Sequence, residues 1–284
     1  MKRLSFFKLL TGIAGLCLLA RPVVAADAPP ALRVLLITGG CCHDYARQKD
    51  ILKEGLEMRA NVVVTQIHTD DKSTKPPLAI LGNPDYAKGY DLVIHDECAA
   101  DVNDPEIIKG ALAPHRAGIP GVNLHCAMHS YRIGNPGQKA EAGTDRSLWF
   151  DYLGLQSSGH GPQLPIAITF TNTTHPVSKN LGDWTTSNEE LYNNIQIFPA
   201  ATPLAYGKQT VKNRDGTEKT NEFVVAWAND YKGTRVFSTT IGHNNTTVGD
   251  TRYLDLVTRG ILWATKKADK DGNPLPGYGP KASK

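Results

Sequence analysis

The first half of the chain alternates between short apolar runs and segments with helical spacing. Between residues 45 and 58, Ile51, Leu52 and Leu56 form an apolar stripe, and Pro105 to His115 has a proline near its first turn. Apolar runs typical of buried strands lie at 33–38, 62–67, 90–95 and 118–125. This alternation predicts an α/β fold, in which helices cover both faces of a parallel sheet.

The second half of the chain has a different pattern. Asn213-Arg214-Asp215-Gly216 is typical of an exposed hairpin tip, and Tyr253 to Ala264 has the spacing of an amphipathic helix. Strand-like runs separated by turn residues lie at 164–170, 202–207, 223–228 and 235–241. We therefore expect an open, mostly parallel sheet with antiparallel edge strands that come from the second half.

The N-terminus has the pattern of an export signal. Basic residues precede an apolar stretch at 9–20, which is too short to span a bilayer comfortably, and Val23-Val24-Ala25 offers a cleavage site. We expect a signal peptide at 1–25, a single domain at 26–265 and a loosely attached, polar, Pro- and Gly-containing tail at 266–284. The predicted location is periplasmic or secreted, with no membrane span after cleavage. An uncleaved anchor is the alternative.

The basic balance of the chain comes from the predicted signal peptide. Removing its four basic residues and no acidic residue changes the net charge from +3 to −1. The remainder has no Lys- or Arg-rich run, so nucleic acid is not an expected partner. The Gly39-Gly40 pair matches neither a dinucleotide fingerprint nor a P-loop, so no nucleotide cofactor is expected. The sequence does not indicate an oligomeric state.

Histidines follow several of the predicted strands. His43 comes after the first apolar run, His125 and His129 after the run at 118–125, and His243 after the run at 235–241. In an open α/β sheet the carboxyl ends of parallel strands line one crevice, so these imidazoles are expected to converge there. We predict that His125, His129 and His43 are catalytic together with Glu190. The predicted metal ligands are His125, His129 and His243.

Other residues near these strand ends are predicted to bind the substrate. Glycines let backbone N–H groups approach a ligand closely, and adjacent acids at a strand end offer one carboxylate to the crevice. Aromatic rings with a polar edge suit the faces of a sugar. The predicted substrate-binding residues are Gly39, Gly40, Asp96, Glu97, Tyr131, Tyr192 and Asn244.

Two kinds of chemistry fit this set of side chains. Several histidines with carboxylates suit a divalent transition metal such as zinc or manganese. The same residues suit acid–base catalysis near neutral pH, because an unperturbed imidazole titrates there. The sequence does not separate these alternatives.

Four cysteines remain after the predicted cleavage, at positions 41, 42, 98 and 126. An exported protein forms disulfides in an oxidising compartment, and four cysteines allow three pairings. All four lie at predicted strand ends in the same crevice, which is unusual for disulfides that brace a fold. Free thiols in the crevice are therefore the other interpretation.

Taken together, these motifs resemble the ThuA-like family of trehalose-utilisation proteins, which has a class I glutamine-amidotransferase-like fold. The resemblance extends over about residues 32–265 and implies a flavodoxin-like sheet. It is carried by the order and spacing of Gly39-Gly40 with His43, YDLVIHDEC, PGVNLHCAMHSY, His175-Pro176-Val177, NEELY, and IGHNN with YLDLVTRGILWA.

The resemblance also implies that the catalytic cysteine of glutamine amidotransferases is absent. A nucleophile elbow needs small residues two positions before and two positions after the presented side chain. An elbow centred on His125 has Asn123 and Ala127 at those positions, whereas one centred on Cys126 has Leu124 and Met128. The sequence therefore favours His125 at the tip and disfavours glutaminase activity.

These observations lead to one main functional hypothesis. We expect an exported enzyme of carbohydrate catabolism that acts on a sugar or keto-sugar derivative by enolisation, isomerisation or β-elimination. A glycoside hydrolase, which needs two carboxylates beside the scissile bond, is the second enzymatic hypothesis. A non-catalytic sugar-binding module is the third. In each case the expected partner is a small carbohydrate.

Overall fold

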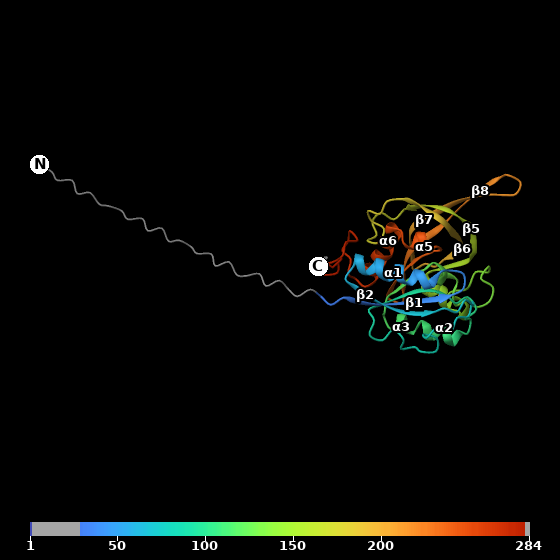
Figure 1. The fold of residues 1–284 in the computed structure, drawn as a ribbon, viewed down its shortest axis with the longest axis horizontal. Coiled ribbons are helices and arrows are strands. Elements are labelled where there is room, and N and C mark those ends of the chain that lie inside the picture. Colours follow the sequence, from blue (N-terminus) through green and yellow to red (C-terminus); the bar gives the residue numbers. More distant parts are fainter. Residues whose placement is uncertain (2–28, 282–284) are drawn as a thin grey trace.

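One mixed sheet runs through the whole domain. The computed structural model describes Met1 and residues 29–281, so the predicted signal peptide lies outside the described residues except for Met1. The strands are β1 (Leu32–Gly40), β2 (Val62–Thr69), β3 (Leu92–Cys98), β4 (Gly121–Leu124), β5 (Leu155–Phe170), β6 (Trp184–Ile197), β7 (Ala201–Lys212), β8 (Glu218–Tyr231) and β9 (Thr234–Thr239). Within the described residues, these nine strands lie in the order β2-β1-β3-β4-β9-β8-β7-β5-β6. Figure 1 shows the ribbon with several of these strands labelled.

The two halves of the sheet pair differently. Strands β2, β1, β3, β4 and β9 are parallel to their neighbours in this order. From β9 onward, each strand through β8, β7, β5 and β6 pairs in the antiparallel sense. The predicted α/β fold class is confirmed, with a parallel part built mainly from the first half and antiparallel strands from the second.

Helices cover both faces of the parallel part. They are α1 (Tyr45–Arg59), α2 (Pro105–Ala111), α3 (Ala113–Arg116), α4 (Leu148–Leu153), α5 (Asn245–Val248) and α6 (Thr251–Ala264), with short 3-10 turns η1 (His125–His129) and η2 (Asp145–Ser147). Helices α1, α5 and α6 contact one another, and α2 contacts α4. Among the described residues, no helix has the length and apolar character needed to cross a membrane.

Strand β1 explains why the sheet needs helices on both sides. Its alternate residues belong to two different apolar clusters: Val34 and Leu36 pack in one, and Leu35 and Ile37 pack in the other. All four are fully buried. Burial of an aliphatic side chain of this size stabilises a fold by about 1.5–3 kcal/mol, so both layers contribute to stability. The continuous apolar run in the sequence reflects this burial on both faces.

The predicted helix at 105–115 is two helices in the structure. Asp104 caps α2 by accepting a hydrogen bond from the backbone N–H of Glu106. The helix ends at Ala111, and a separate turn, α3, contains Pro114. Proline has no N–H to donate to the carbonyl four residues earlier, and its ring clashes with that carbonyl, so the helix cannot continue unchanged through this position.

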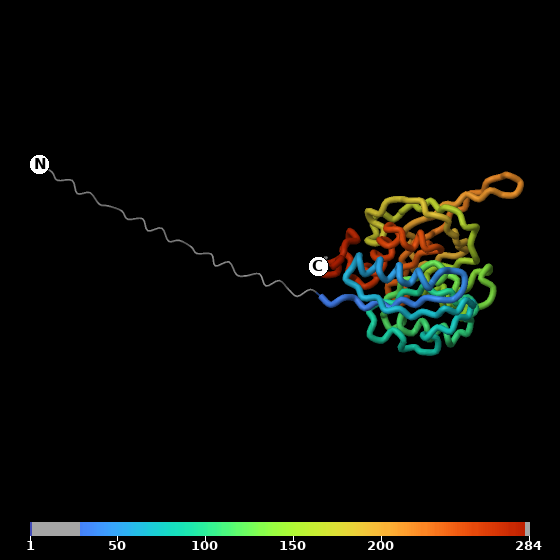
Figure 2. The backbone as a smooth tube through the Cα atoms, in the orientation of Figure 1, coloured from blue at the N-terminus to red at the C-terminus, as the bar shows by residue number. Residues whose placement is uncertain are grey.

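The antiparallel strands are longer than predicted, and one of them was missed. The hairpin between β7 and β8 has Asn213–Gly216 at its tip, as predicted, and it protrudes from the domain (Figure 2). Strand β6 was not predicted, because its sequence at 188–194 is mostly polar rather than alternating. Its paired residues Glu189 and Glu190 are nevertheless buried. The physical reason lies in the site described below.

The C-terminal segment is more closely attached than expected. The backbone carbonyl of Tyr278 accepts a hydrogen bond from the N–H of Asn61, and the side chain of Asp271 forms an ion pair with Lys179. The described part of the predicted tail, residues 266–281, therefore packs against the domain.

Candidate functional site

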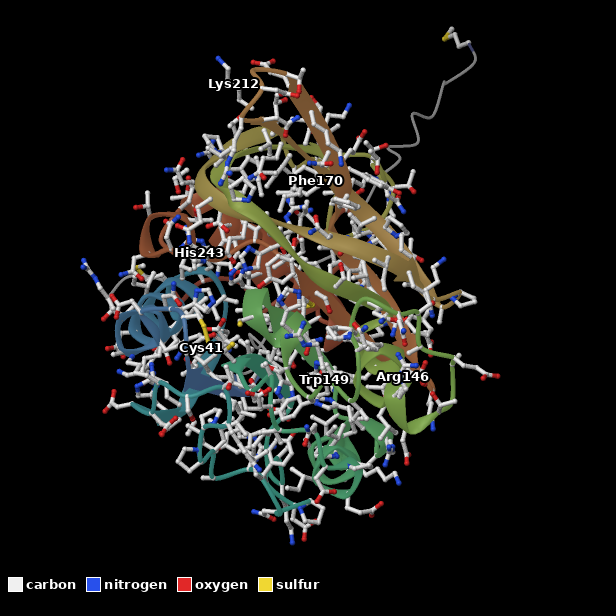
Figure 3. All side chains as sticks on the ribbon, turned by 90° about the vertical axis from the view of Figure 1, so that its right-hand side faces the viewer. Cys41, Arg146, Trp149, Phe170, Lys212 and His243 are labelled. Atoms are coloured by element: carbon white, nitrogen blue, oxygen red, sulfur yellow. A yellow bond between two sulfur atoms is a disulfide. The ribbon has the colours of Figure 1, made fainter. Side chains whose placement is uncertain are left out.

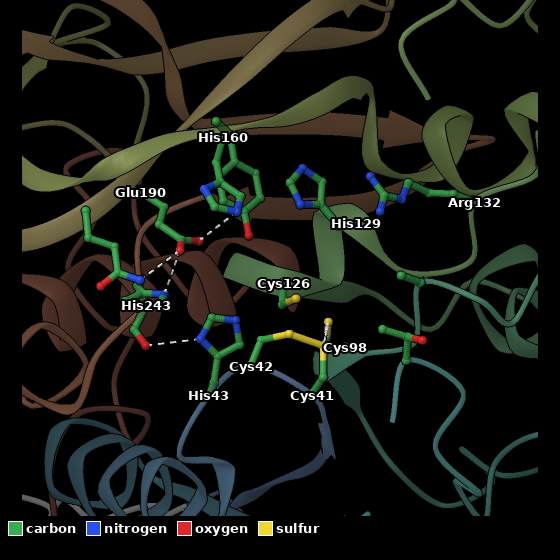
Figure 4. A pocket seen from close by; sticks show the side chains of 14 residues that line it. Cys41, Cys42, His43, Cys98, Cys126, His129, Arg132, His160, Glu190 and His243 are labelled. Atoms are coloured by element: carbon green, nitrogen blue, oxygen red, sulfur yellow. Dashed lines mark hydrogen bonds and ion pairs between the residues drawn. A yellow bond between two sulfur atoms is a disulfide. The ribbon is translucent and has the colours of Figure 1, made fainter. Parts of the chain in front are cut away.

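A cavity of about 320 Å³ opens at the end of the molecule where the parallel strands finish. Figure 3 looks onto this end, with Cys41 and His243 labelled, and Figure 4 shows the cavity from close by. The residues that line it are Cys41, Cys42, His43, Thr74, Cys98, Ala100, Cys126, His129, Arg132, His160, Gln163, Glu190, Tyr192 and His243. Side chains from distant parts of the sequence thus meet at this edge, as the parallel topology requires.

Strand β4 ends in a sharp turn at His125. This residue has a φ of 38°, in the left-handed region that residues other than glycine rarely adopt, whereas Cys126 does not. The turn is therefore centred on His125, as predicted from the small residues on either side. The ring Nδ1 lies 2.6 Å from the carbonyl oxygen of Thr240. Because a carbonyl only accepts, Nδ1 donates to it, and Nε2 is directed toward the hydroxyl of Tyr192, 3.4 Å away.

His43 and His243 lie beside His125. The ring centroid of His43 is 4.7 Å from that of His125 and 4.9 Å from that of His243. The Nδ1 atom of His43 lies 3.2 Å from the backbone carbonyl oxygen of His243, so His43 also has its proton on Nδ1 and a free Nε2. We call His43, His125 and His243 the imidazole cluster.

Glu190 provides the negative charge next to this cluster. Its carboxylate oxygens lie 3.5 Å from Nε2 of His125, 3.4 Å from Nδ1 of His243 and 3.6 Å from Nε2 of His160. Burial raises the pKa of Glu190, but its contacts with His125 and His243 outweigh burial and hold that pKa well below its usual range. Glu190 is therefore ionised at neutral pH.

The charges in the cluster differ between its histidines. The carboxylate of Glu190 raises the pKa of His243 above its ordinary value. Burial, together with the neighbouring His125 and His243, lowers the pKa of His43 to about 3. At neutral pH, His43 is thus a neutral imidazole that can act as a ligand, while His243 holds its proton more strongly.

Glu189 has a different role from Glu190, although the two are adjacent. Side chains alternate along a strand, so the two carboxylates point to opposite sides of β6. Glu189 is fully buried and accepts hydrogen bonds from the backbone N–H groups of Gly242, His243 and Asn244. It thereby fixes the loop that carries His243. The paired acids explain why a polar segment forms a buried strand.

His129 lies apart from the imidazole cluster. Its Nε2 atom is 3.0 Å from the hydroxyl oxygen of Ser157, and its ring stacks on Tyr192 with centroids 4.0 Å apart. The prediction that His125 and His129 share a helical face as metal ligands assumed an α-helical turn. The segment is a 3-10 turn, in which three residues complete a turn, so residues four apart do not share a face. In the structure, His43 takes the place given to His129.

The imidazole cluster fits a divalent metal ion. The ligand atoms of His43, His125 and His243 all lie within 4.8 Å of one another. Three imidazoles with a nearby carboxylate are ligands that zinc and manganese bind, and the protons of His43 and His125 are already held by backbone carbonyls. The Nδ1 atom of His243 is buried, and the carboxylate of Glu190 lies 3.4 Å from it. A metal ion bound at Nδ1 would take the place of its proton beside that carboxylate.

The predicted role of Gly39 and Gly40 in substrate binding is not supported. The N–H of Gly40 donates to the backbone carbonyl of Asp71, so it is not free for a ligand. A Cβ atom on Gly40 would lie 2.2 Å from the carbonyl oxygen of Cys98, and one on Gly39 would lie 2.6 Å from Thr69. Glycine is needed here because β1 passes very close to its two neighbouring strands.

Three other predicted binding residues do not line the cavity. The hydroxyl of Tyr131 donates to Glu97, and the same carboxylate contacts Nδ1 of His95, so both Tyr131 and Glu97 are engaged below the sheet edge. Asp96 is buried, and desolvation raises its pKa well above the ordinary value. The sequence placed these residues after the strand, but β3 continues to Cys98, so 96 and 97 are strand residues that face the two apolar layers.

Asn244 is also outside the cavity, although it follows His243. Its side chain caps α5 by accepting from the N–H of Thr247, and its amide donates to the carbonyl of Asn188. Of the substrate-binding residues predicted from sequence, Tyr192 is the one that lines the cavity.

Several cavity residues had no assigned role in the sequence prediction. Arg132 follows the η1 turn, and His160 and Gln163 lie on β5. Cys41 and Cys42 form a disulfide between neighbouring residues, and Cys98 and Cys126 are free thiols. Strand-end position was a usable signal for Arg132. The sequence contained no comparable signal for the β5 residues, because they reach the cavity from a strand in the antiparallel part of the sheet.

The chain is similar to a family of known proteins and to several solved structures. The ThuA family model, described as trehalose utilisation, matches residues 33–264. A ThuA-like protein from Parabacteroides merdae is 19% identical, with a TM-score of 0.61, and the match covers 88% of this chain and 97% of that one. A ThuA-like protein from Bacteroides uniformis is also 19% identical, with a TM-score of 0.57, and the match covers 90% of this chain and 99% of that one. A GMP synthase subunit from Thermoplasma acidophilum is 9% identical, with a TM-score of 0.47, and the match covers 83% of this chain and 94% of that one.

The family match extends from β1 to the end of α6 and includes the imidazole cluster and Glu190. No match was found among curated proteins. The likeness to the two ThuA-like structures shows the same fold. The description of the family indicates a role in carbohydrate metabolism. By this match and by its strand-end motifs, the chain belongs to the ThuA family.

Proposed function

We propose that this protein is an exported, metal-dependent enzyme of carbohydrate catabolism that acts on a keto-sugar derivative. The observation that carries the proposal is the imidazole cluster, in which two of three histidines have their Nδ1 protons fixed on backbone carbonyls. This arrangement prepares Nε2 of His43 and His125 as ligands, since the other ring nitrogen decides the tautomer. Zinc or manganese is the proposed ion.

The proposed reaction is enolisation next to a sugar carbonyl, followed by isomerisation or β-elimination of a glycosidic group. A bound divalent ion would supply Lewis acidity, which polarises the carbonyl and acidifies the adjacent C–H bond. Two cavity histidines outside the cluster are placed for proton transfer. Burial lowers the pKa of His129 well below its ordinary value, so it is neutral and able to accept a proton. His160 lies beside Glu190 and is placed to deliver one.

The cavity wall suits a sugar ring in this role. His129 and Tyr192 stack with an interplanar angle of 6°, and both rings belong to the cavity wall next to the imidazole cluster. Arg132 lines the cavity beside them and offers several N–H donors to hydroxyl or carbonyl oxygens. A pyranose placed on this surface would direct its polar edge toward Arg132 and the cluster.

The composition of the cavity favours this reaction over glycoside hydrolysis. Hydrolysis by the usual route needs two carboxylates on either side of the scissile bond. Among the described residues that line the cavity, Glu190 is the one acid, and it is already surrounded by imidazoles. Glu189 and Glu97 are committed to internal hydrogen bonds.

The test is solvent deuterium exchange. Purified mature protein, stripped with a chelator and reloaded with zinc or manganese, is incubated in D₂O with a methyl glycoside that carries a ring ketone. We expect deuterium at the carbon next to the carbonyl with the metal-loaded protein and not with the stripped one. His125→Gln should lose exchange, whereas His68→Gln, a matched change at a β2 residue that bonds Asp70 outside the cavity, should keep it.

Each other outcome identifies a different function. Deuterium exchange at the full rate in the metal-free protein would contradict the proposed metal dependence. Bond cleavage without deuterium incorporation would support hydrolysis. Saturable binding of the sugar with neither exchange nor cleavage would support a binding module.

Export is part of the proposal and has its own measurement. The pattern at 1–25 predicts a mature N-terminus at Ala26. Intact mass of the protein from its native host should show the loss of these residues, and a full-length cytoplasmic form would contradict export.

A further inference from the structure

Four sulfur atoms gather on one side of the cavity. Cys41 and Cys42, directly after β1, form a disulfide, and Sγ of Cys41 lies 3.4 Å from Sγ of Cys98 at the end of β3 (Figure 4). Cys126 lies directly after the elbow and packs with Cys98 in one small buried cluster. We call these four residues the sulfur cluster. It is separate from the imidazole cluster, and the proposed sugar chemistry does not use it.

The two free thiols differ in their surroundings. The neighbouring Cys126 thiol lowers the pKa of Cys98; burial opposes this effect, and the positive charge of Arg132 supports it. The neighbouring Cys98 thiol, together with burial, raises the pKa of Cys126 well above its ordinary value. Of the two free thiols, Cys98 therefore forms a thiolate more readily. A thiolate, rather than a thiol, is the species that attacks disulfides.

The sulfurs also differ in their access to solvent. Cys98 is 3% exposed and Cys126 is 5% exposed, whereas Cys42 is exposed to solvent and lines the cavity. A reagent in the cavity therefore meets Cys42 first. As long as Cys42 is bonded to Cys41, however, it has no thiol to react.

We propose that the sulfur cluster is a thiol–disulfide exchange site that moves a reactive thiol from the buried strand end to the cavity surface. The Cys98 thiolate attacks Sγ of Cys41, the Cys41–Cys98 bond forms, the Cys41–Cys42 bond breaks, and Cys42 leaves as the thiolate. The proton that Cys98 gives to solvent is matched by the one that Cys42 takes up, and no net oxidation occurs. The exposed Cys42 thiol, next to His43, is then a modification site for small electrophiles and for low-molecular-weight disulfides.

The backbone makes this exchange feasible without refolding. Gly40 and Cys98 are register partners in the β1–β3 ladder, so the next residue, Cys41, is directly beside Cys98. The contact of 3.4 Å between the two sulfurs is set by this register. A new bond between these sulfurs needs a shift of about 1.4 Å, because a disulfide is about 2.0 Å long.

The test is alkylation of the native protein followed by peptide mapping. Protein purified without reductant is incubated with iodoacetamide at pH 8, digested with trypsin under non-reducing conditions and examined by mass spectrometry. Cleavage after lysine and arginine puts Cys41 and Cys42 in the peptide 34–47, Cys98 in 89–109 and Cys126 in 117–132. We expect the progressive appearance of a cross-link between 34–47 and 89–109, with the alkyl group on Cys42.

Two variants separate exchange from direct opening of the disulfide. Cys98→Ser should keep the internal Cys41–Cys42 bond and show at least a tenfold slower alkylation of Cys42. Cys126→Ser leaves the contact between Cys41 and Cys98 in place, so the cross-link should still form. Thermal melting checks that both variants are folded.

Two results would overturn the proposal. The first is wild-type protein that keeps the bond within 34–47 throughout, whether or not Cys98 is alkylated; this result does not depend on either variant folding. The second is alkylation of Cys42 at the wild-type rate in folded Cys98→Ser.

Discussion

The molecule contains two groups of histidines with a glutamate, and they behave differently. One is the imidazole cluster with Glu190 at the cavity. The other lies below it, among β3, α3 and α4, where Nδ1 of His95 is 2.8 Å from Oε1 of Glu97 and its Nε2 is 3.1 Å from Nε2 of His115. His115 completes the chain through its Nδ1, 2.8 Å from the carbonyl oxygen of Ile119. We call the second group the buried network.

The difference between the groups lies in which ring nitrogens are already used. In the buried network, both nitrogens of His95 and both of His115 have partners, and neither residue has exposed surface. In the imidazole cluster, Nδ1 of His43 and of His125 is used, whereas Nε2 of His125 and Nδ1 of His243 have only long contacts, at 3.5 Å and 3.4 Å from the Glu190 carboxylate. A closed network stabilises a fold, whereas an open one has capacity left for a ligand.

The largest expected effect comes from removing a histidine of the imidazole cluster. We expect His125→Ala to lower turnover by about 100-fold or more and to reduce the amount of bound metal. Loss of a residue that only supports a metal ligand already lowers metal affinity or activity by about 10- to 100-fold. Metal content and rate are measured on the same preparation. His115→Ala is the matched change in the buried network, and it should keep the metal. Equal metal loss in the two variants would remove the distinction between the groups.

The second prediction concerns the free energy of unfolding, on which we expect a larger effect from the buried network than from the imidazole cluster with Glu190. Glu97→Ala leaves His95 and Tyr131 without their buried partner, so the free energy of unfolding should fall by about 3 kcal/mol. Glu190→Ala also removes a buried carboxylate, but water in the cavity can solvate the imidazoles left behind, so the free energy of unfolding should fall by less than in Glu97→Ala. Urea denaturation of the metal-free proteins measures both. A larger loss for Glu190→Ala would show that the cavity carboxylate is mainly structural.

The contrast also explains what the sequence could predict. The parallel strands were predictable because continuous apolar runs mark burial on both faces, and the gathering of His43, His125 and His243 follows from that topology. The buried network was not predictable. His95 and His115 are twenty residues apart and meet only because α3 returns to the end of β3.

The missed features have physical causes of the same kind. Strand β6 has no apolar alternation at its centre, because Glu189 holds a loop and Glu190 faces the cavity. The role of His129 depended on whether a five-residue turn is α-helical or 3-10, and a change of that size is beyond what spacing determines. The sulfur pairing depended on the register of β1 against β3.

A third prediction uses pH to separate the charges of the cluster. Glu190 raises the pKa of His243, so in the metal-free protein this pair stabilises the fold below the ordinary pKa of histidine, and the contribution is lost as pH rises through the raised pKa. Metal binding has the opposite dependence, because His243 must lose its proton to become a ligand. Below the raised pKa, metal affinity should fall by about tenfold per pH unit.

Glu190→Gln is the variant that tests this assignment. Without the carboxylate, the pKa of His243 should decrease, and the acid limb of metal affinity should move to lower pH. Calorimetric titrations with zinc between pH 5 and 8 measure the limb. An unchanged limb would mean that a group other than His243 controls the proton competition.

The smallest expected effect marks the boundary of the cluster at Asn244, the residue after His243. Its side chain caps α5 through the N–H of Thr247 and does not line the cavity. Asn244→Ala should therefore lower the free energy of unfolding by about 1 kcal/mol, the usual effect of losing a helix cap, and leave KM within about twofold. Asn244→Asp keeps an acceptor for the cap and should regain most of the stability. A large rise in KM with unchanged stability would instead place Asn244 in contact with the substrate, as its position in the sequence suggested.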